Sequence, residues 1–157
     1  MRFLATLPLA VAVLGCSSRY IANTQIEDTE ENRSVLEVVE HYRRAMEDKD
    51  LDRILSLISD SFFEDPGTPH DPKDDYDKAR LKERLTESFA RLKEQRLDIS
   101  PRKVKIDDEE RGAQVEYVYD FRYLLALPQG DLWKQDIDVN RLTLRKEGET
   151  WKVVSGL

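Results

Sequence analysis

Three residues carry groups capable of acid–base chemistry at positions that need an explanation. Asp138 lies with Asn140 in the middle of a predicted strand, where both residue types are depleted. Asp65 precedes a Pro-Gly pair, and Tyr42 lies on the apolar stripe of a predicted helix. Each also has a structural interpretation: a hydrogen-bond network for the strand pair, a turn for Asp65 and a core tyrosine for Tyr42. The residue types alone leave both interpretations open.

Other kinds of site find less support in the sequence. His41 and His70 are the only two histidines and form no pair with zinc-ligand spacing. The acidic run between Asp71 and Asp77 has oxygen ligands but lacks the spacing of a calcium-binding loop. The sequence contains no serine or cysteine elbow and no glycine-rich phosphate loop. We therefore expect no metal site and no cofactor.

Charge and composition exclude some classes of protein. The chain of 157 residues has 25 Lys and Arg against 32 Asp and Glu, a formal charge of −7. A nucleic-acid binder needs clustered cations, so we expect no nucleic-acid partner. With 39% apolar and 36% charged residues, the composition predicts one globular domain with a well-solvated surface.

The N-terminal segment has the features of a targeting signal. An apolar run from Phe3 to Leu14 is too short to span a bilayer as a helix, and it ends in Val-Leu-Gly-Cys at Cys16. This ending resembles the lipobox of bacterial lipoproteins, which implies cleavage before Cys16 and lipidation of its sulfur. The alternative is an ordinary secretory signal with a chance cysteine. We predict a signal peptide over 1–15, a lipidated tether over 16–28 and a domain over 29–157, anchored in the bacterial cell envelope. Ser17 favours the outer membrane, facing the periplasm.

The domain divides into a helical block and a strand block. Apolar residues recur at steps of three and four in three segments, which predicts three helices: Val35 to Met46, Leu51 to Ile58, and Leu81 to Leu92. Their expected N-caps are Asp28, in a capping box with Glu31, then Asp50 and Asp77. After Arg96 the period changes to two and predicts antiparallel strands near 97–106, 113–123, 132–146 and 151–155. Helices followed by antiparallel strands indicate an α+β fold with three N-terminal helices on one face of the sheet.

This order of elements, ending in Trp-Lys-Val-Val-Ser-Gly, resembles the nuclear transport factor 2-like (SnoaL-like) superfamily over about Glu30 to Leu157. The resemblance implies a strongly curved sheet that forms a cone-shaped, cystatin-like roll around an internal pocket. Tyr119 and Asn140 are the residues we expect on the pocket wall. Because this fold hosts binding, structural and enzymatic domains, it does not by itself select an activity.

Three short stretches resemble ketosteroid isomerase more closely: His-Tyr-Arg at 41–43, Phe-Glu-Asp-Pro at 63–66 and Ile-Asp-Val at 137–139. The resemblance implies Asp65 as general base and Tyr42 and Asp138 as donors to an oxyanion. Such chemistry needs one ionised carboxylate to take a proton beside a carbonyl and one protonated acid to stabilise the enolate.

Two functions follow as hypotheses. The first is a lipid-anchored envelope domain that binds a small apolar ligand or a protein partner in or near its pocket, without catalysis. The alternative is an isomerase- or cyclase-type enzyme that uses Asp65, Tyr42 and Asp138. In either case Trp133, Ile137 and Val139, on the predicted outer face of the sheet, suit a homodimer contact.

Overall fold

The helices and the long strands are separate blocks of the chain. The computed structural model describes residues 19–65, 74–107 and 111–157, so the predicted signal peptide, Cys16, His70 and Asp71 lie outside the described residues. The helices are α1 (Glu30–Glu47), α2 (Leu51–Leu57) and α3 (Lys78–Arg91). The long strands are β3 (Leu92–Asp107), β4 (Gly112–Leu125), β5 (Leu132–Glu147) and β6 (Thr150–Ser155). Two further strands of two residues each, β1 (Phe63–Glu64) and β2 (Tyr76–Asp77), pair with one another.

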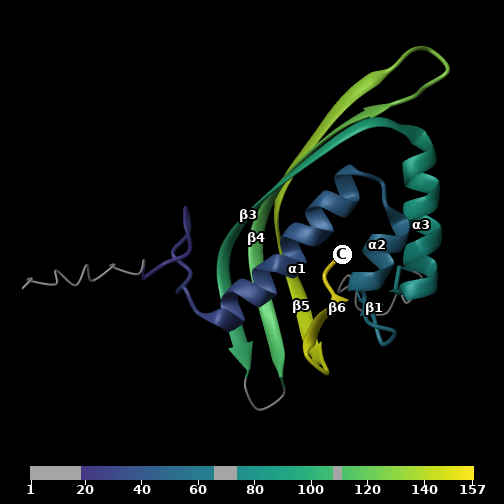
Figure 1. Cartoon of the computed structure of the whole chain (residues 1–157). Coiled ribbons are helices and arrows are strands. Elements are labelled where there is room, and N and C mark those ends of the chain that lie inside the picture. The colour runs from purple at the N-terminus through teal and green to yellow at the C-terminus, as the bar shows by residue number, and fades with distance from the viewer. Residues whose placement is uncertain (1–18, 66–73, 108–110) are drawn as a thin grey trace, which may run out of the picture.

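The long strands form one curved, unclosed antiparallel sheet in the order β3-β4-β5-β6. Figure 1 shows α1 crossing the concave face of this sheet, with α2 and α3 on the same side. The core lies between these layers, where Val35 and Ile54 from the helices meet Val115, Leu142 and Val153 from the sheet, all fully buried. This arrangement confirms the predicted α+β class and the segregation of the helices onto one face.

The helix caps follow the predicted pattern with one correction. Asp50 and Asp77 accept hydrogen bonds from the backbone N–H groups of Arg53 and Arg80, as N-caps do. The predicted N-cap of α1 is wrong by one residue. Thr29, and not Asp28, accepts a hydrogen bond from the backbone N–H of Asn32. Asp28 is instead ion-paired with Arg33.

The third predicted helix ends one residue early, and the strand after it is longer than expected. Leu92 begins β3 instead of completing the apolar stripe of α3. Pro101 does not end the strand, because a bulge between Pro101 and Lys103 accommodates it. Before the bulge the odd-numbered residues, such as Ile99, face the core, and after it the even-numbered residues, such as Val104, do so. The bulge therefore explains why the apolar residues of this strand change from odd to even positions in the sequence.

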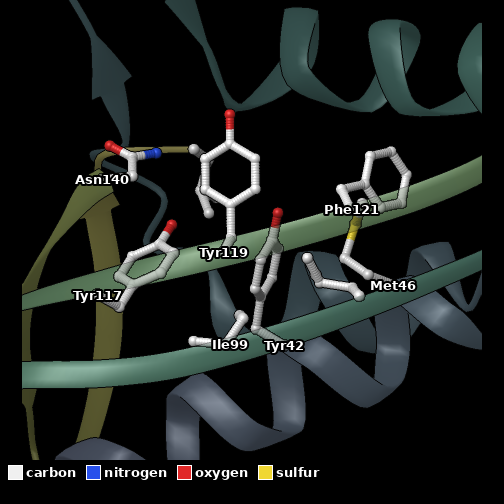
Figure 2. A pocket seen from close by; sticks show the side chains of 9 residues that line it. Tyr42, Met46, Ile99, Tyr117, Tyr119, Phe121 and Asn140 are labelled. Carbon is white, nitrogen blue, oxygen red and sulfur yellow. The ribbon is translucent and has the colours of Figure 1, made fainter. Parts of the chain in front are cut away.

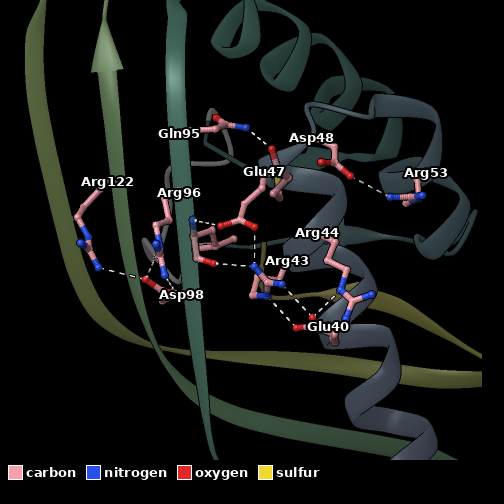
Figure 3. A network of polar contacts seen from close by, with 12 residues as sticks. Glu40, Arg43, Arg44, Glu47, Asp48, Arg53, Gln95, Arg96, Asp98 and Arg122 are labelled. Atoms are coloured by element: carbon pink, nitrogen blue, oxygen red, sulfur yellow. Dashed lines mark hydrogen bonds and ion pairs between the residues drawn. The ribbon is translucent and has the colours of Figure 1, made fainter.

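Side chains of α1 cover part of the outer edge of β3. The carboxylate of Glu47 accepts a hydrogen bond from the backbone N–H of Leu97 at 3.1 Å, and the guanidinium of Arg43 approaches the carbonyl of the same residue at 3.5 Å. Arg43 is itself paired with Glu40 and Glu47 (Figure 3). Because an uncovered edge strand is a site for unwanted pairing, this network both fixes α1 on the sheet and protects the β3 edge.

Candidate functional site

A cavity of about 200 Å³ lies between α1 and the concave face of β3, β4 and β5. Its walls combine five apolar side chains with four that carry hydrogen-bonding groups (Figure 2): Met46, Leu97, Ile99, Phe121 and Leu157, with Tyr42, Tyr117, Tyr119 and Asn140. An apolar cavity of about 150 Å³ suffices to hold a benzene ring. The cavity therefore has room for one ring with a small substituent.

Tyr42 reaches the cavity from the apolar stripe of α1. Figure 2 shows its hydroxyl pointing the same way as the hydroxyls of Tyr117 and Tyr119. Within residues 19–65, 74–107 and 111–157, no group forms a hydrogen bond with the Tyr42 hydroxyl. Burial, with smaller effects of Tyr117 and Tyr76, raises the pKa of Tyr42 well above its ordinary value. Tyr42 is therefore a neutral hydrogen-bond donor available to a ligand, and not a base.

Tyr117 and Asn140 form a fixed polar pair on the cavity wall. They are direct cross-strand partners of β4 and β5, and the Oδ1 atom of Asn140 accepts a hydrogen bond from the backbone N–H of Arg141 at 2.7 Å. Only 4% of Tyr117 is exposed, and this burial raises its pKa to about 12. The Asn140 amide also donates to the carbonyl of Gly156 at 3.3 Å. These contacts hold the orientation of the amide before any ligand enters.

Tyr119 is held by a carboxylate outside the cavity lining. Its hydroxyl donates to the Oδ2 atom of Asp136 at 3.2 Å. Burial and this hydrogen bond to Asp136 raise the pKa of Tyr119. Since its proton is committed to Asp136, Tyr119 contributes mainly its ring to the wall.

Glu64 is an acidic residue bonded to the wall residue Leu157, and the sequence did not distinguish it from its neighbours. Its carboxylate accepts hydrogen bonds from the backbone N–H groups of Gly156 and of Leu157, the latter at 3.1 Å. Its charge also contributes to the raised pKa of Tyr117. Burial alternates along this segment, with Phe62 at 2% exposure and Phe63 at 52%. Because alternate residues of a strand share a face, Glu64 lies on the same inward side as Phe62. The sequence alone does not show which of the two phenylalanines is buried.

The three candidate catalytic residues do not converge on the cavity. Tyr42 lines it, whereas Asp65 and Asp138 are both exposed and are not among the residues that form its wall. The Oδ1 atom of Asp138 accepts a hydrogen bond from the backbone N–H of Val139 at 2.7 Å. In this geometry Asp138 acts as an acceptor, the opposite of the donor role that an oxyanion site requires. The two expected pocket residues, Tyr119 and Asn140, do lie on the wall.

The described residues contain no group of three His, Cys, Asp or Glu side chains able to hold a metal ion. In the same part of the chain, no helix combines the length and apolar character needed to cross a membrane.

Residues 34–154 match the family model described as the NTF2-like N-terminal transpeptidase domain. The chain belongs to this NTF2-like family. The match covers most of the chain and confirms the superfamily that the order of elements predicted. No curated protein matches the sequence of this NTF2-like domain.

Solved structures show the same fold at low sequence identity. A conserved protein from Planctomyces limnophilus has 12% identity and a TM-score of 0.68, with 80% of this chain and 92% of that chain covered. A ketosteroid isomerase-like protein from Erwinia carotovora atroseptica has 15% identity and a TM-score of 0.65, with 82% and 94% covered. At such identities the likeness establishes the fold of the NTF2-like domain and does not establish an activity.

Proposed function

We propose that this NTF2-like domain is a binding module whose cavity holds a small ligand with one apolar ring and one hydrogen-bonding group, without catalysing a reaction. The main support for this proposal is the position of the Tyr42 hydroxyl. It faces a cavity of about 200 Å³ and has no partner among the described residues. Few convergent polar groups in a mainly apolar pocket are typical of small-molecule sites. The ring would contact Leu97, Ile99 and Phe121.

The polar groups of the wall favour binding over proton transfer. Tyr42 and Tyr117 hold their protons at neutral pH, since burial raises both pKa values. The carboxylate of Glu64 is occupied by two backbone N–H groups. An enzyme that abstracts a proton needs a base within reach of the substrate carbon, and Asp65 does not line the cavity. The isomerase or cyclase hypothesis therefore has less support than binding.

The proposal includes the envelope location inferred from the first sixteen residues. A diacylated or triacylated Cys16 would provide stable attachment, because two or more acyl chains bury enough CH₂ groups for lasting membrane binding. Intact-mass measurement of the protein extracted from bacterial membranes tests this part separately. A mature chain that starts at an acylated Cys16 supports it, and an uncleaved chain or an unmodified cysteine contradicts it.

A pair of matched probes tests the ligand class. Toluene and p-cresol share the ring and the methyl group, and only p-cresol carries a hydroxyl. NMR titration of the full-length protein should shift the amide signals of Leu97, Ile99 and Phe121 with both probes, and p-cresol should bind about three- to tenfold more tightly, as expected for one net hydrogen bond. Shifts confined to other parts of the protein, or no shifts at all, would refute the proposal.

A further inference from the structure

One edge of β5 is unpaired over most of its length. β5 pairs with β4 from Leu132 to Arg145, but β6 pairs with it only over Thr143–Glu147. Among the described residues, no strand lies on the second edge of the segment 132–142. Figure 1 shows this part of β5 extending with β4 beyond the helices.

The alternation of the strand identifies which backbone groups face the unpaired edge. The N–H of Lys146 bonds to the carbonyl of Arg111 on the β4 side, so the even-numbered residues face β4. The N–H groups of Val139 and Arg141 bond instead to the side chain of the preceding residue, at 2.7 Å each. The odd-numbered residues therefore direct their N–H and C=O groups to the unpaired edge: Trp133, Gln135 and Ile137.

The edge is protected at one end and open at the other. Asp138 and Asn140 cap the N–H groups of the residues that follow them, which prevents another strand from using those donors. No described side chain caps the edge-facing N–H groups between Trp133 and Ile137. Both of these residues are 57% exposed on the outer face. An open edge beside large apolar side chains is suited to pairing with another strand.

We propose that this edge of β5 pairs antiparallel with the same strand of a second copy of the protein, with Gln135 opposite Gln135 on the two-fold axis. In this register Lys134 faces Asp136 of the other copy on the inner side, twice by symmetry. Trp133 faces Ile137 of the other copy on the outer side. Opposite charges and aromatic–β-branched pairs are the cross-strand neighbours that stabilise a sheet. The strand is thus complementary to itself.

Neighbouring registers are less favourable. A shift by two residues in one direction places Asp136 opposite Asp136 and uses Val139, whose N–H is already bonded to Asp138. The opposite shift places Lys134 opposite Lys134. Since like charges directly opposite one another destabilise a sheet, the register centred on Gln135 is selected. This pairing is independent of the proposed ligand site.

A charge exchange tests the pairing by sedimentation of the full-length protein. The unchanged protein should form a dimer. Lys134→Asp and Asp136→Lys alone should each weaken it by at least about tenfold, because each places like charges opposite one another. The double variant should restore the dimer. Asp136→Lys also removes the acceptor of the Tyr119 hydroxyl, and the double variant has the same loss. A dimer restored in the double variant therefore reports on the charge pair between the two strands and not on the Tyr119 hydrogen bond. A monomeric protein, or a double variant no better than the singles, would overturn the proposal.

Crosslinking tests the register. In a Cys16→Ser background, which removes the only cysteine, Gln135→Cys should oxidise to a covalent dimer. The Cα atoms of a hydrogen-bonded antiparallel pair lie about 5.5 Å apart, within the range that a disulfide spans. Trp133→Cys is the control and should remain uncrosslinked, because it lies opposite Ile137. Crosslinking of Trp133→Cys equal to that of Gln135→Cys would refute this register.

Discussion

Asn140 lies directly opposite Tyr117 on the neighbouring strand, and its side chain is held by two backbone groups, the N–H of Arg141 and the carbonyl of Gly156. Both side chains line the cavity, and Asn140 links β5 to the residue that follows β6. One side of the cavity is thus built before a ligand arrives, whereas Tyr42 on the opposite helix keeps an uncommitted hydroxyl. Preorganised walls with one free donor suit selective binding of a small molecule.

Asn140 should stabilise the contact between β5 and the residue that follows β6. Asn140→Leu should lower the free energy of unfolding by about 0.5–1.5 kcal/mol, because it removes the side-chain partner of the Gly156 carbonyl and of the Arg141 N–H. Gln114→Leu, at an exposed position of β4, is the matched control and should have little effect. Urea unfolding of the two variants measures the difference. Equal stability of the two variants would contradict this role of Asn140.

Tyr42→Phe should separate binding from stability. The free energy of unfolding should change by less than about 0.5 kcal/mol, because the hydroxyl has no partner among the described residues. Affinity for p-cresol should fall about three- to tenfold, while affinity for toluene should stay the same. A parallel loss for both probes would mean that Tyr42 acts through packing rather than as a donor.

Glu64 should stabilise the segment after β6. Glu64→Ala removes the acceptor of two backbone N–H groups and should cost about 1–2 kcal/mol of unfolding free energy, with the signals of Gly156 and Leu157 shifted in NMR spectra. Glu87→Ala, at an exposed position of α3, is the matched control and should have little effect. Equal stability of the two variants would remove Glu64 from this role.

Glu40 should contribute to acid sensitivity. Hydrogen bonds from Arg43 and then Arg44 lower the pKa of Glu40 from 4.5 to about 2. Because the folded value lies below the unfolded one, the contribution is complete above about pH 5 and is lost as the pH falls towards about 2. The side chain is 42% exposed, so solvent screening limits the gain to about 0.5–1 kcal/mol.

The measurement for Glu40 is thermal unfolding of the unchanged protein and of Glu40→Gln between about pH 7 and pH 2. The difference between the two melting temperatures should be largest at neutral pH and should shrink towards pH 2. Glu37→Gln, at an exposed position of the same helix, serves as control. A difference in melting temperature that grows as the pH falls would contradict the stabilising role of ionised Glu40.

Periodicity in the sequence was sufficient to predict the layers of this fold. The step of three and four that brings Val35, Val38 and Tyr42 to one face of α1 depends only on helix geometry. The alternation from Ala113 to Tyr119 likewise predicts the inward face of β4. Long elements with one buried face leave little freedom, which is why the fold class and the superfamily could be predicted.

Short elements and local contacts were harder to predict. β1 has two residues, too few for an alternating pattern, so the sequence could not distinguish Glu64 from Asp65 as the inward acid. Thr29 and Asp28 are both good helix caps, and Asp28 is engaged by Arg33, which lies five residues along the chain. The alternation of the strand predicted the face on which Asp138 lies, but it did not predict that the side chain is exposed there.

Filling the cavity shows most clearly whether the domain binds its ligand there. Ile99→Trp places a larger side chain on the wall, whereas Ala90→Trp places the same side chain on an exposed position of α3. Dissociation constants of p-cresol from both variants, each checked for folding by circular dichroism, decide between the possibilities. Ile99→Trp should stay folded and lose p-cresol affinity by at least about tenfold, while Ala90→Trp should bind p-cresol as the unchanged protein does. A folded Ile99→Trp variant that binds p-cresol as tightly as the unchanged protein would contradict binding in this cavity.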